Sequence, residues 1–209
     1  MIDLYTWGTP NGRKVSIMLE EVGLPYRVHA VNVGAGEQFE AAFLDISPGG
    51  KIPAIVDQET GTKMMQSGAI LLYLAEKTGR LLPEDKDARW QVMEWLMWQM
   101  GDLGPMLGQA HYFLKFNAGR VPYAEERYHT IAENLYGVLD RRLEGREFFV
   151  GDYSVADVAT WPWISRFEWH RVRITDFPNV TRWYRAIAAR PAVQAGYHLP
   201  EKINEIPMP

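Results

Sequence analysis

The sequence predicts an α/β domain over residues 1–80, a linker over 81–87 and an all-helical domain over 88–209. Near the N-terminus, apolar residues alternate as in a strand and then recur at helical spacing. Beyond residue 87 the helical rhythm continues with no clear strand. A chain of 209 residues that is 47% hydrophobic is long enough to form two cores of ordinary domain size.

The first domain is expected to follow the order βαβ and then ββα. Ile2, Leu4 and Thr6 alternate with Asp3 and Tyr5, which is typical of a strand. The other elements expected are a helix that starts at Asn11-Gly12 and is apolar at Val15, Met18, Leu19 and Val22, strands at 26–33, 54–56 and 63–65, and a helix over 67–78 that Gly79 ends.

The second domain is expected to contain four helices. The first begins near Asp87 and is expected to direct five residues inward, namely Trp90, Met93, Trp95, Leu96 and Met97. A cluster of Gly101, Gly104, Pro105 and Gly108 is expected to kink or break it. The remaining helices are predicted at 123–144, from Ser154 with Asp157 as its capping partner, and at 178–190, before a proline-rich tail at 199–209.

Composition excludes several classes of function. A net charge of −4 and scattered basic residues disfavour nucleic acid as a partner. The absence of cysteine excludes disulfides, thiolate metal sites and a protein thiol nucleophile. No apolar run approaches the ~18 residues of a membrane span, and no basic and apolar leader precedes the first strand. We therefore expect a cytoplasmic protein without metal or membrane contact.

Two dipeptides around a predicted hairpin indicate a binding site for an extended peptide. In the segment KIPAIVDQETGTKMMQSGAILLYL, Ile52-Pro53 and Gln66-Ser67 stand 14 residues apart. A cis proline would turn the N–H and C=O groups of Ile52 outward for pairing with a peptide. Ser67 is expected to be the N-cap of the next helix, where its hydroxyl and the first amides would meet a carboxylate.

Longer motifs carry a resemblance that covers nearly the whole chain. They are, in order, MIDLY, TPNG, ISP, KIPAIVD, SGAILLYLAEKTG, LGPMLGQ, YAEERY and ADVATWPW. With these runs the chain resembles the cytosolic glutathione transferases, most closely the bacterial Nu class (YfcG-type) of glutathione-dependent disulfide-bond oxidoreductases. The resemblance implies a thioredoxin-like first domain, a homodimer without metal, and glutathione as cosubstrate, bound as one molecule, two, or the disulfide.

Thr9 and Asn11 are the candidate catalytic residues, because they lie where the first predicted helix begins. A thiol pKa of about 8.5 must fall by about two units, which requires ~2.7 kcal/mol. A helix N-terminus can supply up to ~2 kcal/mol and a hydrogen bond to a charged group ~1.5–3 kcal/mol. The resemblance also implies Thr9 and Asn11 at the thiol. Some other transferase classes use a tyrosine near the start of the chain for this purpose. Tyr5 falls within the first strand here and is interpreted as a packing residue.

The resemblance further implies glutathione contacts at Gln38, Lys51, Ile52, Pro53, Gln66, Ser67 and Arg127. Lys51 would pair with the glycine carboxylate, and Gln66 and Ser67 would hold the γ-glutamyl end. Many family members carry an acidic residue at position 66, where Gln66 is neutral. Arg127 would meet an anion, in this subunit or in the neighbouring site of the dimer, or else it belongs to a solvated helix face.

Other functions remain open at the level of sequence. A conventional transferase would conjugate the same thiolate to small electrophiles. A glutathione-binding regulator is also conceivable, because the Nu class is similar to a yeast nitrogen regulator, whose Asn/Gln-rich arm this chain lacks. Aromatic residues and histidines that could line a second-substrate pocket or belong to the core are Trp7, His111, Tyr112, Phe116, Trp163, Phe167, Trp169 and His170.

Overall fold

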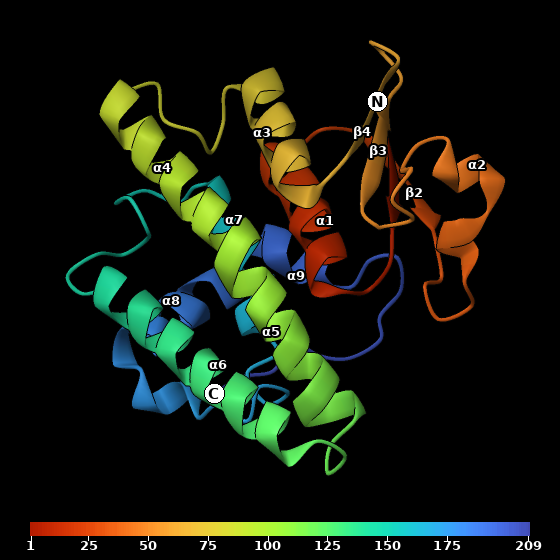
Figure 1. Ribbon diagram of the computed structural model, residues 1–209. Coiled ribbons are helices and arrows are strands. Elements are labelled where there is room, and N and C mark those ends of the chain that lie inside the picture. Colours follow the sequence, from red (N-terminus) through yellow and green to blue (C-terminus); the bar gives the residue numbers. More distant parts are fainter. The chain divides into compact units, whose positions relative to one another are not determined.

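The computed structural model describes residues 1–209, which divide into two compact units (Figure 1). Unit 1 consists of Met1–Leu82 and Ala189–Ile206, and unit 2 of Pro83–Ala188 and Pro207–Pro209. The predicted fold class is confirmed, because unit 1 contains a four-stranded mixed sheet with helices and unit 2 is helical. Residues 189–206, which the sequence boundaries assign to the helical domain, pack within unit 1.

Unit 1 is built on a sheet with the strand order β2-β1-β3-β4. Strands β1 and β2 are parallel, and the β1–β3 and β3–β4 pairs are antiparallel. In Figure 1, α1 and α3 lie on one side of the sheet and α2 on the other. The elements are β1 (Ile2–Thr6), α1 (Pro10–Val22), β2 (Tyr26–Ala30), η1 (Glu37–Phe39), α2 (Ala41–Leu44), β3 (Ala54–Asp57), β4 (Thr62–Met65), α3 (Ser67–Thr78) and α9 (Pro191–Tyr197).

Local sequence explains where the two long helices of unit 1 begin and end. The Thr9 side chain accepts the amide hydrogen of Gly12 over 3.2 Å, and Pro10 occupies the first helical position of α1. Gly23 ends α1 and Gly79 ends α3, with φ of 69° and 65°, in the left-handed region that glycine adopts without a Cβ clash.

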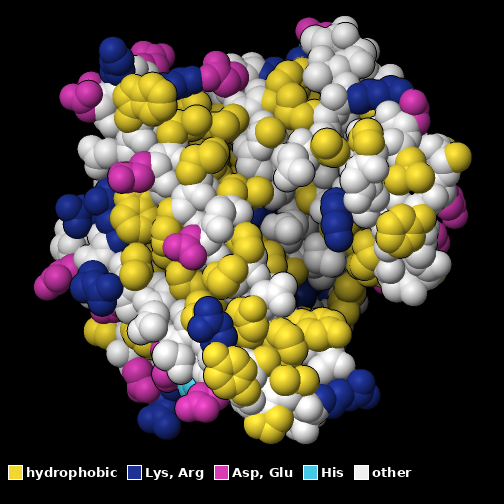
Figure 2. All heavy atoms as spheres, in the orientation of Figure 1, with side chains coloured by type: hydrophobic (Ala, Val, Ile, Leu, Met, Phe, Trp, Pro, Cys, Tyr) yellow, Lys and Arg dark blue, Asp and Glu magenta, His cyan; other side chains and the backbone are white.

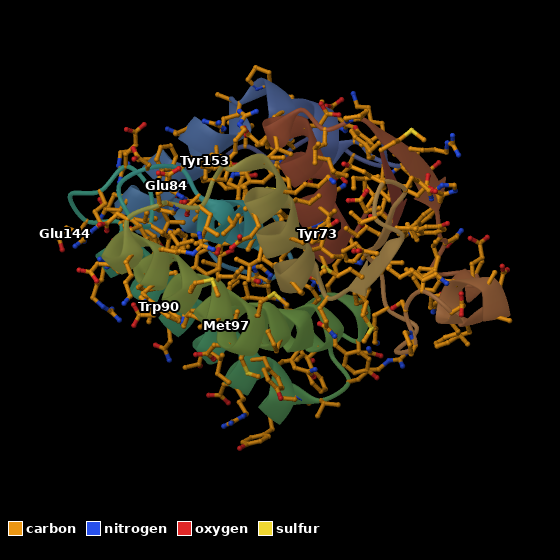
Figure 3. The ribbon with its side chains drawn as sticks, turned by 90° about the horizontal axis from the view of Figure 1, so that it is seen from above. Tyr73, Glu84, Trp90, Met97, Glu144 and Tyr153 are labelled. Atoms are coloured by element: carbon orange, nitrogen blue, oxygen red, sulfur yellow. The ribbon has the colours of Figure 1, made fainter.

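Helix α3 is also anchored at its C-terminal half, far along the helix from Ser67. Tyr73 lies on α3, as Figure 3 shows, and its hydroxyl donates to Asp57 Oδ2 over 2.6 Å. The Lys77 ammonium approaches the same oxygen to 2.9 Å. Burial alone would raise the pKa of Asp57, but these two hydrogen bonds lower it to about 2. The charged cluster therefore ties α3 to the end of β3.

Helix α9 is an element that the sequence analysis did not predict. It is only seven residues long, with Pro191 as its first residue and Val193 and Tyr197 buried. Two apolar positions in so short a segment give no clear period, so the preceding helix was expected to be the last. Gly196 is where α9 meets α1, because a Cβ there would lie 2.7 Å from the backbone of Ile17.

Unit 2 contains the remaining helices. They are α4 (Lys86–Trp98), the π-helical stretch η2 (Gln99–Leu103), α5 (Gly104–Ala110), a second π-helical stretch η3 (His111–Phe116), α6 (Pro122–Arg142), α7 (Val155–Ile164), the 3-10 turn η4 (Ile174–Asp176) and α8 (Pro178–Ala188). No helix of the chain combines the length and the apolarity that crossing a lipid bilayer requires.

The inward face expected for the first helix of unit 2 is wrong. Val92 and Leu96 are buried, whereas Trp90 and Met97 are 65% and 51% exposed. The five residues expected to point inward cannot share one face of a helix with 3.6 residues per turn. The glycine cluster does not break the helix, which continues from α4 through η2 into α5. Gly101 lies in the wider π turn of η2, and Gly104 begins α5, where a Cβ would lie 2.8 Å from Gln99 Nε2.

The capping box predicted at the start of α7 is confirmed. Asp157 accepts hydrogen bonds from the Ser154 amide and hydroxyl, both at 3.0 Å, and from the Trp183 indole at 2.8 Å. Burial raises the pKa of Asp157 to about 6 against the opposing effect of these donors. The residue thus ties together α7 and α8, in agreement with its interpretation as structural.

Candidate functional site

The sheet register brings the predicted glutathione-binding segments of unit 1 to one end of the sheet. Tyr5 on β1 pairs with Ala54 on β3, and Ala54 pairs with Met65 on β4. The turn after β1, the Ile52-Pro53 pair before β3 and the Gln66-Ser67 pair after β4 therefore share this end. Strand β2 runs parallel to β1, so the segment that leads to Gln38 leaves from the same end.

Thr9 and Asn11 lie in the connection from β1 to α1. The Thr9 amide donates to Trp7 O over 2.7 Å, which makes a tight turn directly before the helix. Gly12 permits this turn, because a Cβ on it would lie 2.1 Å from Trp7 O. Thr9 and Asn11 are both half-buried at the positive end of the α1 dipole. The expected helix start is one residue late, since Pro10 already belongs to α1.

In the segment before β3, the side chain of Ile52 is held in place while its backbone stays unpaired. The Ile52 side chain packs against the buried cluster of Val31, Phe43 and Ala54. The Ile52 backbone N–H and C=O groups form no backbone–backbone hydrogen bond. The Ile52-Pro53 peptide bond is cis, as predicted. An extended peptide could pair with this free backbone as an added strand.

Gln38 and Lys51 border the same segment. The Ser47 hydroxyl donates to Lys51 O over 2.8 Å and so fixes the Lys51 backbone, while the Lys51 side chain is exposed. A Cβ on Gly50 would lie 3.3 Å from Gln38 O, so η1 packs directly on this segment. The side-chain Oε1 of Gln38 is buried and accepts no hydrogen bond within the protein. It is an acceptor that a ligand N–H could satisfy.

The expectation that Ser67 is the N-cap of α3 is wrong. Gln66 occupies the cap position, and Ser67 is the first residue of the helix. Gln66 has φ of 74°, which is uncommon for a residue with a side chain, and its C=O accepts the amide hydrogen of Ile70 over 3.0 Å. The cap was expected one residue too late. Strand β4 ends at Met65, so Gln66 alone connects the strand to α3.

Lys14 is a residue of this region that the sequence analysis missed. It lies on α1, is only 1% exposed, and its ammonium donates to Ser67 Oγ over 3.4 Å. The spacing contained a signal, because Lys14 lies four residues before the buried Met18 and thus on the apolar face of the helix. Burial holds the pKa of Lys14 well below its ordinary value.

Tyr5 has the packing role expected for it. It is half-buried, packs against the same apolar cluster as Ile52, and stacks on His29 with ring centroids 4.6 Å apart. Its place within β1 puts it before the Trp7–Thr9 turn rather than in it.

Arg127 and most of the candidate pocket residues belong to unit 2. Arg127 is exposed on α6. His111, Trp163, Phe167 and His170 are buried and belong to the core of this unit, whereas Tyr112 and Phe116 are exposed. No group of three or more His, Cys, Asp or Glu side chains is arranged to hold a metal ion.

Comparison with known proteins identifies relatives of both halves of the chain. Residues 9–77 match the model of the glutathione S-transferase N-terminal domain, and residues 105–191 match that of the C-terminal domain. The disulfide-bond oxidoreductase YfcG of Escherichia coli is 46% identical, over 92% of this chain and 92% of the relative.

Solved structures with the same fold contain glutathione. A glutathione transferase from Pseudomonas putida, with one glutathione disulfide bound per subunit, is 43% identical with a TM-score of 0.91, covering 95% of this chain and 91% of that one. A glutathione transferase from Burkholderia graminis, with two glutathione molecules per subunit, is 45% identical with a TM-score of 0.91, covering 96% and 89%.

Proposed function

Since this chain belongs to the glutathione S-transferase family, we propose that it is a glutathione-dependent thiol–disulfide oxidoreductase. The observation that carries this proposal is the absence of cysteine from a chain similar to a disulfide-bond oxidoreductase. A protein without a thiol cannot form a mixed disulfide with its substrate. Both electrons of the reduction must then come from glutathione.

The reaction balances with two glutathiones for each disulfide. The thiolate of the first attacks one sulfur of the substrate RS–SR, forming GS–SR and releasing RS⁻, which takes up a proton. The thiolate of the second attacks the glutathione sulfur of GS–SR, forming GS–SG and releasing the second RS⁻. Relatives that hold two glutathiones or the glutathione disulfide per subunit support a site able to hold both reactants.

The chain supplies groups suited to each part of glutathione. Thr9 and Asn11, at the start of α1, would stabilise the thiolate through hydrogen bonds and the helix dipole. The free backbone of Ile52, next to Pro53, would pair with the cysteinyl unit. Lys51 would meet the glycine carboxylate. Ser67 and Gln66 would hold the γ-glutamyl end, and Gln38 Oε1 would accept a ligand N–H.

An exposed apolar stripe on α4 supports a homodimer. Figure 3 shows Trp90 and Met97 along one side of α4, and they are 65% and 51% exposed. Large exposed aromatic and Met side chains are enriched at protein interfaces. On the face shown in Figure 2, acidic and basic side chains are interspersed around apolar ones. In such a dimer, Arg127 would bind an anion in the partner's site.

The cytoplasmic location stays a prediction.

The test compares two reactions of the same thiolate. We expect glutathione-dependent reduction of 2-hydroxyethyl disulfide to exceed conjugation of 1-chloro-2,4-dinitrobenzene in kcat/KM. A conjugation rate that exceeds disulfide reduction would favour the conventional transferase instead. Binding of glutathione with neither reaction would favour a regulatory protein.

A further inference from the structure

Lys14 reaches from α1 to the first residue of α3. Its ammonium donates to Ser67 Oγ over 3.4 Å, and both side chains are almost completely buried, with Ser67 only 4% exposed. The contact lies within unit 1, at the end of the sheet where the predicted glutathione-binding segments meet. Lys14 also lies three residues after Asn11, so one face of α1 connects the candidate thiol site to Ser67.

The contact determines the direction of hydrogen bonding at Ser67. An ammonium group has three donors and no acceptor, so Ser67 Oγ must accept from it. The Ser67 hydroxyl hydrogen is then directed to a different acceptor, and the adjacent charge strengthens it as a donor. A hydroxyl that donates is what a carboxylate requires, because an ionised carboxylate only accepts hydrogen bonds.

The neutral residue at position 66 makes this arrangement more important. Gln66 carries no charge to pair with the γ-glutamyl ammonium, so recognition of this end depends more on its carboxylate. Helix α3 begins at Ser67 and is 12 residues long, so its first amides also favour an anion there. The Lys14 charge has the same sign as the positive end of that helix dipole.

We propose that Lys14 is a positioning residue for glutathione: it fixes the Ser67 hydroxyl as a donor to the γ-glutamyl carboxylate. This role rests on the function proposed above. A merely structural role is the competing explanation, but an apolar side chain would fill the same space without the cost of burying an ammonium. Burial lowers the pKa of Lys14, which agrees with such a cost.

A double-mutant cycle on the intact chain tests the proposal, with S-methylglutathione as a probe that has no thiol to titrate. Calorimetry is expected to show about tenfold weaker binding for Lys14→Met and at least about tenfold for Ser67→Ala. The double variant is expected to bind within about twofold of Ser67→Ala, because Lys14 acts through the hydroxyl. The melting temperature of ligand-free Lys14→Met is measured in parallel, so that a loss of affinity is not mistaken for partial unfolding.

Lys63→Met is the matched control, because Lys63 is an exposed lysine of the same unit that pairs with Asp45. It should bind the probe as the wild type does. Unchanged affinity in Lys14→Met, or an equal loss in the Ser67→Ala background, would overturn the proposal. Should Lys14→Met not fold, Lys14→Gln, which keeps an N–H donor without the charge, replaces it in the same cycle. Failure of the wild type to bind the probe would instead refute the proposed function.

Discussion

His111 and His170 share a hydrogen bond between their Nε2 atoms, 2.9 Å apart in the interior of unit 2. The Tyr136 hydroxyl lies 2.9 Å from Nδ1 of His170, which extends the chain of polar groups. Two imidazoles can be linked in this way when both are neutral, one donating and the other accepting. Burial lowers the pKa of His111 to about 3 and that of His170 well below its ordinary value.

This pair predicts that the protein loses stability in mild acid. Unfolded histidines take up protons below about pH 6.5, while the folded pair does not, so their contribution is lost as the pH falls below 6.5. From pH 7.5 to 5.5 the two histidines should lower the free energy of unfolding by about 3 kcal/mol. Asp157, with its pKa raised to about 6, opposes this by about 1 kcal/mol, so these three groups together give a loss of about 2 kcal/mol.

Urea unfolding at both pH values measures the effect. His111→Gln can still hydrogen-bond with His170 and should remove about half of the histidine contribution. His129→Gln, at a partly exposed histidine of α6, should behave as the wild type. The same pH dependence in all three proteins would show that the buried pair does not cause it.

Gly12 is predicted to be essential for the turn that precedes α1. In Gly12→Ala the new Cβ would lie 2.1 Å from Trp7 O and 2.5 Å from Thr6 Oγ1, so the backbone must shift. We expect a loss of about 1–3 kcal/mol in the free energy of unfolding, together with reduced disulfide reduction. Gly101→Ala is the control, because nothing lies within 4 Å of a Cβ there and the change should be neutral or slightly stabilising. Equal stabilities of the two variants would refute this account.

The exposed stripe on α4 predicts the oligomeric state. Sedimentation equilibrium at micromolar concentration should show a dimer, and the double change Trp90→Glu and Met97→Glu should shift it toward monomer by placing charges in an apolar interface. Met208→Glu, at an exposed methionine of the C-terminal tail, serves as the control. A monomeric wild type would remove both the dimer and the proposed role of Arg127 in a neighbouring site.

The sequence predicted the four strands of unit 1, helices α1 and α3, the cis Ile52-Pro53 bond and the capping box of Ser154, because each depends on nearby residues, but it did not predict the short elements η1 and α2 between β2 and β3. It did not predict the features that depend on packing between residues far apart in the sequence. Trp90 lies on the outer face of α4 although it is aromatic, and Lys14 is buried although it is charged. The contact between Lys14 and Ser67 joins residues 53 positions apart, which no local pattern reveals.

Asn11 and Tyr5 offer the sharpest test of the candidate catalytic residues. If Asn11 stabilises the thiolate, Asn11→Ala should cut disulfide-reductase turnover by about tenfold or more, since ~1.5 kcal/mol of charge stabilisation corresponds to that factor. Tyr5→Phe should have almost no effect, because Tyr5 contributes packing and its ring stacks on His29.

Both variants should be assayed with wild type for glutathione-dependent reduction of a model disulfide, and their melting temperatures compared to exclude unfolding. Asn11 lies at the helix start, where a side-chain donor and the dipole act on the same charge, whereas Tyr5 precedes the turn. Inactive Tyr5→Phe beside active Asn11→Ala would instead place the chain with the tyrosine-type transferases. Conjugation would then become the favoured reaction.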